Sequence, residues 1–168
     1  QTCALPILLD EMGEVIRPSI IWCDQRTGAE VEDMLKIMPR EEWIRITANP
    51  PLTGWTAAKI LWVRKNEPEN YNRCRHILLP KDYIRYILTG VFATEVSDAS
   101  GMQLLDVPGR CWSDEVLKAL NIDKDLLGKV YESCEATGTL LADVAKRTGL
   151  SEKCMVAGGA GDNAAAAV

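Results

Sequence analysis

The sequence has one histidine, one phenylalanine and no long apolar run, and each shortage excludes a class of protein. The single histidine, His76, is too few for a zinc site built on histidines, so a structural role is favoured for it. Apolar stretches such as residues 20–23 have the size of a β-strand and fall far short of the roughly 20 residues that span a bilayer. No secretory signal is visible. We therefore expect a cytoplasmic protein without a membrane segment.

The cysteines lack the spacing of a zinc site, and the basic residues are too scattered to form a nucleic-acid-binding surface. The six cysteines include no Cys-x-x-Cys pair, which argues against a zinc site, and their place in apolar segments favours reduced, buried thiols. The net charge of −5 comes without a basic cluster, so nucleic acid is not expected as a partner. With 168 residues, 47% of them hydrophobic, the chain is long enough for one domain with a real core.

Segments with helical and strand-like patterns alternate along the chain, which predicts an α/β domain with a mixed sheet. Strands are expected at residues 19–23, 76–79, 102–106, 136–140 and 154–157. Helices are expected at residues 27–38, 41–47, 55–65, 69–74, 81–88, 113–120 and 141–148. Thr27 with Glu30 matches a capping box for the first helix, while Pro80 and Gly90 suit the start and end of the helix at 81–88.

The last fifteen residues carry a pattern that points to chemistry. Residues 154–157 read as a buried strand, the glycines at 158, 159 and 161 permit a tight turn, and Asp162 opens an alanine-rich helix. Backbone N–H groups at a helix N-terminus keep a carboxylate ionised and fix its orientation, so the carboxylate can accept a proton from a bound hydroxyl. On this stretch alone, however, an N-cap role for Asp162 is the stronger interpretation.

Six segments in order carry a resemblance that periodicity alone does not show. They are IWCDQRT (21–27), TGWTAAKILW (53–62), LPKDYIR (79–85), TG (89–90), SDASG (97–101) and GGAGDNAA (158–165). Each segment is weakly specific by itself, but their order and spacing resemble the FGGY carbohydrate kinases, xylulokinases most closely. The resemblance extends over residues 8–168.

The resemblance implies a ribonuclease-H-like fold of the actin and sugar-kinase superfamily. Residues 8–168 would form part of an N-terminal domain, and a second, C-terminal domain would close the sugar cleft. The implied reaction is ATP-dependent phosphorylation of D-xylulose to D-xylulose 5-phosphate, assisted by Mg²⁺. The full-length protein would act on a small-molecule sugar, and a homodimer is an open alternative for its assembly.

The resemblance also assigns roles to individual residues. The acid of the family's Gly-Asp-Asn motif is the general base, which here is Asp162, and Asn163 would contact the sugar hydroxyls. Trp55 lies near the place where relatives carry a sugar-contacting side chain, although a position in the core suits this tryptophan at least as well. No metal ligand is assigned within this chain.

Several features of the family pattern do not occur in the sequence. Residues 1–7 read like the translation of a DNA-sequencing adapter, so we treat them as a non-native leader. The first strand with its Asp-x-Gly-Thr turn, the Met-His segment that contacts the sugar, and the C-terminal half with most of the nucleotide site are missing. We therefore expect these 168 residues by themselves to bind ATP poorly and to be inactive.

Three alternatives stay open. The protein could be a kinase of the same family that acts on ribulose, gluconate, fuculose or glycerol. It could be a non-catalytic actin-like module, or a truncated reading frame without activity of its own. In the intact gene, the Met-His segment and the C-terminal domain would separate the kinases of the family. An upstream Asp-x-Gly-Thr strand and a downstream Gly-Thr-Ser phosphate loop would argue against the non-catalytic module.

Charged residues in the family segments have two interpretations. Arg26, Lys59, Lys81 and Arg85 could bind phosphate or sugar. Solvated helix faces are the favoured interpretation for them, or pairs with near neighbours such as Asp24 with Arg26 and Asp82 with Arg85. Asp98 could orient a substrate hydroxyl, but an Asx-turn explains it more simply.

Overall fold

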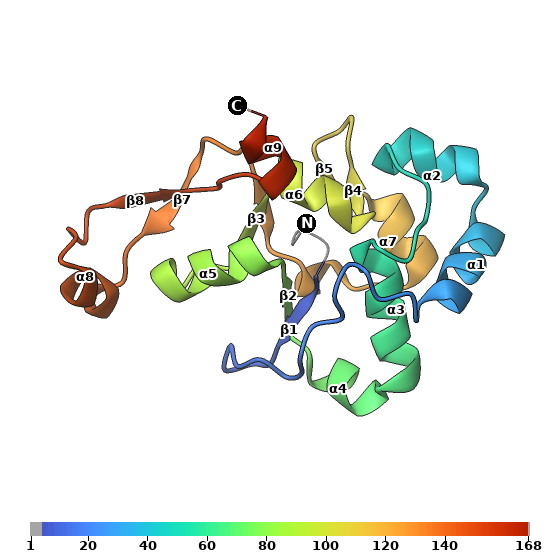
Figure 1. Ribbon diagram of the computed structural model, residues 1–168, viewed down its shortest axis with the longest axis horizontal. Helices are drawn as coiled ribbons and strands as arrows, with labels where there is room; N and C mark the ends of the chain where they lie inside the picture. Colours follow the sequence, from blue (N-terminus) through green and yellow to red (C-terminus); the bar gives the residue numbers. More distant parts are fainter. Residues whose placement is uncertain (1–4, 168) are drawn as a thin grey trace.

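A computed structural model of the chain describes residues 5–167 and has helices and strands in alternation (Figure 1). The α-helices are α1 (Gly28–Ile37), α2 (Arg40–Thr47), α3 (Thr56–Asn66), α4 (Pro68–Arg73), α5 (Pro80–Thr89), α6 (Val96–Ala99), α7 (Asp114–Leu120), α8 (Ala142–Thr148) and α9 (Asp162–Ala166). The 3₁₀ helices are η1 (Ser100–Met102) and η2 (Lys124–Leu126). The strands are β1 (Ile7–Leu9), β2 (His76–Leu78), β3 (Ala93–Glu95), β4 (Leu105–Asp106), β5 (Cys111–Trp112), β6 (Lys129–Tyr131), β7 (Ala136–Thr139) and β8 (Met155–Ala157).

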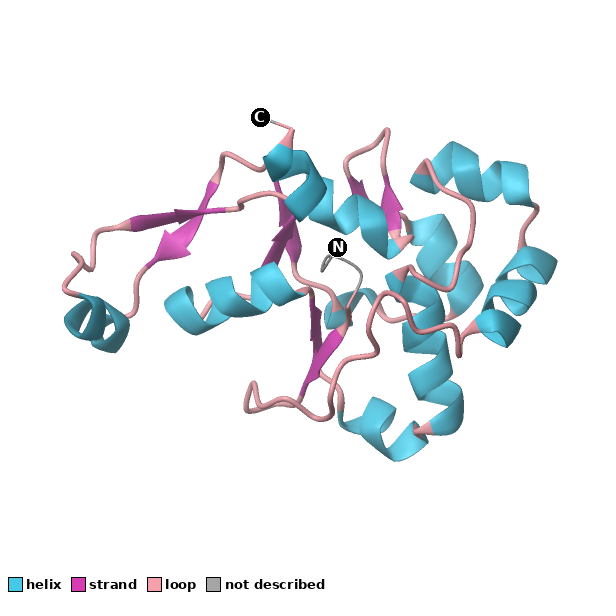
Figure 2. Ribbon diagram, viewed as in Figure 1, coloured by secondary structure: helices cyan, strands magenta, loops and turns pink. Residues whose placement is uncertain are grey.

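The strands form two-stranded sheets. β1 pairs antiparallel with β2, and β3 pairs parallel with β6. An isolated parallel bridge between Ile77 of β2 and Leu127, which precedes β6, links these two pairs. β4 with β5 and β7 with β8 form two further short antiparallel pairs (Figure 2). The mixed α/β architecture expected from the sequence is confirmed, while residues 1–4 of the expected leader lie outside the described residues.

The main hydrophobic core lies between the β1–β2 pair and helices α1, α2, α3 and α7. Trp43 is one of its largest fully buried side chains, and its indole N–H donates to the carbonyl oxygens of Met34 and Met38 at 3.2 and 3.1 Å. The ring therefore fills the core without leaving a buried polar atom unpaired. Burial of an aliphatic side chain of this core stabilises the fold by about 1.5–3 kcal/mol.

Several helix boundaries follow the signals in the sequence. Pro80 is the first residue of α5, and Gly90 ends it with φ of +72°, a left-handed conformation that glycine adopts without strain. Ser113 caps α7, since its hydroxyl oxygen accepts a hydrogen bond from the Val116 N–H at 3.2 Å. Pro39 directly precedes α2. These boundaries are set by local chemistry, and the predictions made for them are confirmed.

Two expectations near the start of the chain are wrong. Residues 19–23 form no strand; they run as a loop in which Ile21 and Trp22 are 51% and 48% exposed. An extended segment needs a neighbouring strand for its backbone groups, and none lies beside this one in the described part of the chain. The capping box also fails, because the Thr27 hydroxyl donates to the Thr53 carbonyl oxygen at 3.3 Å and does not cap α1.

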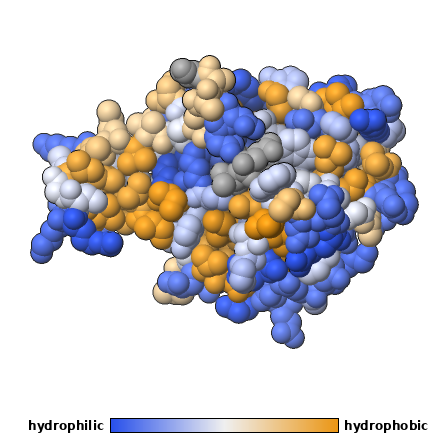
Figure 3. All heavy atoms as spheres, viewed as in Figure 1, coloured by the Kyte–Doolittle hydropathy of each residue, from blue (hydrophilic) through white to orange (hydrophobic). Residues whose placement is uncertain are grey.

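The β7–β8 pair with α8 extends from the body as an arm (Figure 1). The sequence predicted a buried strand at residues 154–157, but Met155 in β8 is 72% exposed, because β8 pairs with β7 alone. Figure 3 shows hydrophobic side chains gathered over this arm and the neighbouring α5. They include exposed Ile84, Ile87 and Leu141.

Two further differences concern strand length and the cysteines. The strand expected at residues 102–106 is reduced to β4, because residues 100–102 form η1. Cys74 is buried as expected, but four other cysteines are exposed, so the prediction of buried thiols is wrong for them. They are Cys23, Cys111, Cys134 and Cys154. None of the helices within residues 5–167 has both the length and the apolar character that crossing a bilayer requires.

Candidate functional site

The structure brings the three predicted site residues together. Trp55, Asp162 and Asn163 all line one cleft of about 320 Å³. Trp55 precedes α3, while Asp162 and Asn163 begin α9. The remaining wall comes from the loop before α3, from α6 with η1, and from the segment before α9. These further lining residues are Asn49, Ser97, Asp98, Ser100, Gly101, Gly161 and Ala164.

Asp162 is exposed at the cleft as the first residue of α9. Gly161 occupies the N-cap position, so the interpretation of Asp162 as an N-cap is wrong. The Asp162 carboxylate accepts a hydrogen bond from the Asn163 N–H at 2.8 Å. An exposed carboxylate at the mouth of a cleft has the chemistry to accept a proton from a hydroxyl bound there.

The glycine-rich segment before α9, residues 158–161, is tightly packed. A Cβ atom added to Gly158 would lie 2.8 Å from the Glu132 carbonyl oxygen and 3.1 Å from the Glu95 Cβ. Gly159 has a φ of +82°, which a residue with a side chain adopts only with strain. The structure assigns no hydrogen-bonded turn to residues 158–161, so the predicted tight turn is not confirmed. Gly158 is required by the lack of space for a side chain, and Gly159 by its backbone conformation.

Charged side chains of α5 bind the backbone of this glycine segment. Arg85 in α5 is 3% exposed and donates to Asp82 Oδ1 at 2.9 Å and to the Gly158 carbonyl oxygen at 2.8 Å. Lys81 Nζ lies 2.8 Å from the same Asp82 oxygen and donates to the Gly158 oxygen at 3.1 Å. Lys81 Nζ is also 3.7 Å from Asp98 Oδ2. The predicted Asp82–Arg85 pair is confirmed, and Lys81, whose side chain is 26% exposed, also pairs with its neighbour Asp82.

The other two basic residues of the family segments differ from each other. Arg26 pairs with Asp24 at 2.7 Å on the surface, as predicted. Lys59 is fully buried in α3, so the expectation of a solvated face is wrong for it. Its ammonium donates to the Gly54 carbonyl oxygen at 2.6 Å. Burial lowers the pKa of Lys59 to about 8, although the charge of Asp24 acts in the opposite direction.

The model of the FGGY family of carbohydrate kinases, N-terminal domain, matches residues 5–168. The chain belongs to the FGGY family of carbohydrate kinases. It is 45% identical to a xylulose kinase of Escherichia coli (strain K12) over 161 residues, which are 96% of this chain and 33% of the relative. The chain thus spans about a third of the length of the curated relatives that it matches.

Solved structures of kinases share the fold. The crystal structure of a xyloylose kinase from Brucella ovis has a TM-score of 0.91 and 38% identity, covering 98% of this chain and 33% of that one. A gluconate kinase from Lactobacillus acidophilus has a TM-score of 0.86 and 25% identity, covering 94% of this chain and 32% of that one. The expected sugar-kinase fold is confirmed by the family match and by these structures.

Glu95 is a residue of this FGGY chain whose importance sequence reasoning missed. It is fully buried at the end of β3, where its carboxylate caps α6 by accepting hydrogen bonds from the Ser97 and Asp98 N–H groups. Burial opposes its ionisation, yet hydrogen bonds from Ser133 and these amides, with the charge of Lys81, hold the pKa of Glu95 below its ordinary value. A single glutamate in the small and polar segment at residues 93–100 offers no signal of this role in the sequence.

Trp55 forms one wall of the FGGY cleft. Its ring packs against Gly101, where an added Cβ would lie 3.4 Å from the Trp55 Cζ3 atom. The side chain is half-buried, and its indole N–H has no acceptor among the described residues. This geometry suits an indole that supports the fold with one face and offers the other to the cleft.

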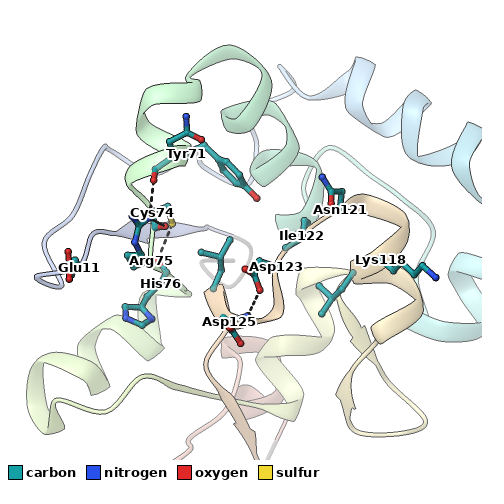
Figure 4. A pocket seen from close by; sticks show the side chains of 13 residues that line it. Glu11, Tyr71, Cys74, Arg75, His76, Lys118, Asn121, Ile122, Asp123 and Asp125 are labelled. Atoms are coloured by element: carbon teal, nitrogen blue, oxygen red, sulfur yellow. Dashed lines mark hydrogen bonds between the residues drawn. The ribbon is translucent and has the colours of Figure 1, made fainter.

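A larger hollow, of about 970 Å³, lies elsewhere, where Figure 4 shows Lys118, Asn121 and Asp123 across from Arg75 and His76. Its lining mixes both signs of charge, and none of the residues predicted for the site lines it. His76 stacks on Phe92 with ring centroids 3.6 Å apart, which supports the structural role predicted for it. The Asp162 cleft is therefore the candidate site of this FGGY protein.

Proposed function

We propose that the full-length protein transfers the γ-phosphoryl group of ATP to the terminal hydroxyl of D-xylulose. The observation that carries this proposal is the meeting of Asp162, Asn163 and Trp55 in one cleft. The relative from Escherichia coli and others at 40% identity are xylulose kinases, which supports the choice of sugar. Because the chain covers about a third of these relatives, the activity is proposed for the whole protein.

In the proposed reaction, the sugar hydroxyl oxygen forms a bond to the γ-phosphorus. The bond between that phosphorus and the oxygen of the leaving ADP breaks, and the hydroxyl proton passes to the Asp162 carboxylate. Phosphoryl transfer has a loose transition state, so the base need not be strong and the protein mainly positions the reacting groups. Asn163 hydrogen-bonds the sugar hydroxyls and Trp55 provides an apolar wall.

ATP is the proposed phosphoryl donor, and Mg²⁺ is the divalent ion that such transfer commonly uses. Among residues 5–167, no three histidine, cysteine, aspartate or glutamate side chains converge as a metal site would require. None of the steps above is assigned to the metal. Nucleotide contacts are likewise not assigned to this chain.

The test measures ATP consumption by the full-length protein with D-xylulose, D-ribulose, L-fuculose, gluconate and glycerol side by side. We expect preference for D-xylulose and a loss of about 10²- to 10⁴-fold in kcat for Asp162→Asn, the usual range for removing a general base. Asp143→Asn is the matched control, because Asp143 is an exposed acid in the first turn of α8, outside the cleft. Near-normal turnover by Asp162→Asn would refute the base.

One structural neighbour favours a second candidate. The gluconate kinase from Lactobacillus acidophilus shares the fold with a TM-score of 0.86, so preference for gluconate in the panel would keep the mechanism and change the substrate. No turnover with any sugar would support a non-catalytic actin-like module. The homodimer, the cytoplasmic location, the division at residue 8 and the inactivity of the 168 residues alone stay predictions.

A further inference from the structure

We propose that Ser97 is a positioning residue for Asp162, and that Glu95 fixes the orientation of Ser97. This inference rests on the proposed function, in which Asp162 is the general base. It assigns to the SDASG segment a task that is separate from binding the substrate. One hydrogen bond joins α6 to the segment that precedes α9.

Ser97 connects two segments that are far apart in the sequence. Its hydroxyl oxygen accepts a hydrogen bond from the Gly161 N–H at 3.0 Å, across 64 residues of chain. The same hydroxyl donates to Glu95 Oε1 at 2.9 Å. The Gly161 N–H belongs to the peptide unit between Ala160 and Gly161, so this contact holds the backbone that leads directly into Asp162.

Glu95 determines which way the Ser97 hydroxyl points. An ionised carboxylate can only accept hydrogen bonds, and a serine hydroxyl has a single hydrogen to donate. Glu95 accepts from the Ser97 N–H and the Asp98 N–H, each at 2.8 Å, and from the Ser133 hydroxyl at 2.7 Å. Since the Ser97 hydrogen is directed to Glu95, the lone pairs of its oxygen are left for the Gly161 N–H.

The segment before α9 is anchored at successive residues. Lys81 and Arg85 both donate to the Gly158 carbonyl oxygen, and the Gly159 N–H donates to the Ser133 carbonyl oxygen at 3.0 Å. Ser97 provides the last of these anchors before Asp162. Helix α9 contributes no buried residue, so burial of its own side chains does not fix the direction of Asp162.

Loss of the Ser97 hydroxyl releases that last anchor. The segment stays attached at Gly158 and Gly159, so the site persists, but Asp162 samples more directions. A misplacement of about 1 Å costs about 10²-fold in rate, because the proton acceptor must lie within hydrogen-bond reach of the reacting hydroxyl. We expect Ser97→Ala to lower kcat about 10- to 100-fold with a much smaller change in KM for the sugar.

The experiment compares full-length Ser97→Ala with full-length Ser113→Ala. Ser113 is a matched control because its hydroxyl also accepts a backbone N–H, that of Val116, but caps α7 outside the cleft. The measurements are kcat, KM for the sugar, thermal unfolding, and hydrogen exchange of the peptide that covers residues 158–163. We expect similar losses of thermal stability in the two variants, but lower kcat and faster exchange in this peptide for Ser97→Ala alone.

The other outcomes contradict either the positioning role of Ser97 or the proposed function. Unchanged kcat or unchanged exchange in Ser97→Ala overturns the positioning role, as does a raised KM at unchanged kcat, which indicates direct substrate binding. Equal kcat losses in both variants also overturn it, since they indicate a general effect of stability. If the parent protein turns over no sugar, the proposed function fails instead, and hydrogen exchange alone decides whether Ser97 anchors the segment before α9.

Discussion

The buried ammonium of Lys59 donates a hydrogen bond of 2.6 Å to the carbonyl oxygen of Gly54. This contact ties the first turns of α3 to the loop that ends at Trp55, one wall of the candidate cleft. Lys59 therefore acts within the fold, behind the site. Its position has a cost, because water no longer solvates the charge.

We expect Lys59 to make stability depend on pH. Its pKa is about 8 in the folded protein against 10.5 for the ordinary side chain, so the unfolded state binds more protons between these values. The contribution of Lys59 to the free energy of unfolding therefore rises as pH increases through 8, by about 2 kcal/mol between pH 7 and pH 9.5. Denaturant unfolding of the parent and of Lys59→Met at both pH values measures it.

The informative quantity for Lys59 is the difference between the two proteins, because other groups titrate in the same range in both. Lys59→Met retains the length and burial of the side chain without its charge. The parent should gain more stability than the variant on raising the pH. Equal gains in the two proteins would contradict a depressed pKa for Lys59.

Substitution of Gly158 should damage both stability and turnover. In Gly158→Ala the new Cβ would lie 2.8 Å from a backbone oxygen, that of Glu132, which moves only with the chain. We expect a loss of about 1–3 kcal/mol in the free energy of unfolding. Gly28→Ala is the control, because nothing lies within 4 Å of a Cβ there, and it should be neutral or slightly stabilising. Equal changes in the free energy of unfolding of the two variants would show that the backbone around Gly158 can accommodate a Cβ atom.

Substitution of Trp55 should change KM for the sugar more than KM for ATP. If its indole forms the apolar wall for the sugar, Trp55→Leu removes an aromatic contact of about 0.5–1.5 kcal/mol beyond its buried area. We expect KM for D-xylulose to rise several-fold while KM for ATP stays constant in the full-length protein. A parallel rise in both constants, or reduced thermal stability alone, would assign Trp55 to the core.

Cys74 should resist alkylation in the native protein. Burial raises the pKa of its thiol from 9.0 to about 11, which lowers the reactive thiolate fraction about 100-fold at pH 8. Cys23 is exposed and serves as an internal reference. Mass spectrometry after a short iodoacetamide pulse should find label on Cys23 and little on Cys74, whereas labelling in denaturant should reach both. Equal labelling in the native protein would contradict the burial.

Local chemistry made several elements predictable. Pro80 and Gly90 mark the ends of α5, and Ser113 caps α7, because capping and backbone conformation act over a few residues. The role of Asp162 as a candidate base came from the resemblance to the FGGY kinases, because the local pattern alone favoured an N-cap. Local pattern failed where a partner was needed: residues 19–23 have strand-like side chains but no strand to pair with in the described part of the chain.

The sequence by itself determined the alternation of helices and strands, the glycine-rich segment and the identity of Asp162 as a candidate base. Only the tertiary structure decided how Asp162 is held. Ser97 meets Gly161 across 64 residues, and Lys81 and Arg85 reach Gly158 from α5. Contacts of this kind depend on how separate elements pack, and side-chain periodicity carries no information about them. The same reason explains why Lys59 and Arg85, charged residues on helices, are buried.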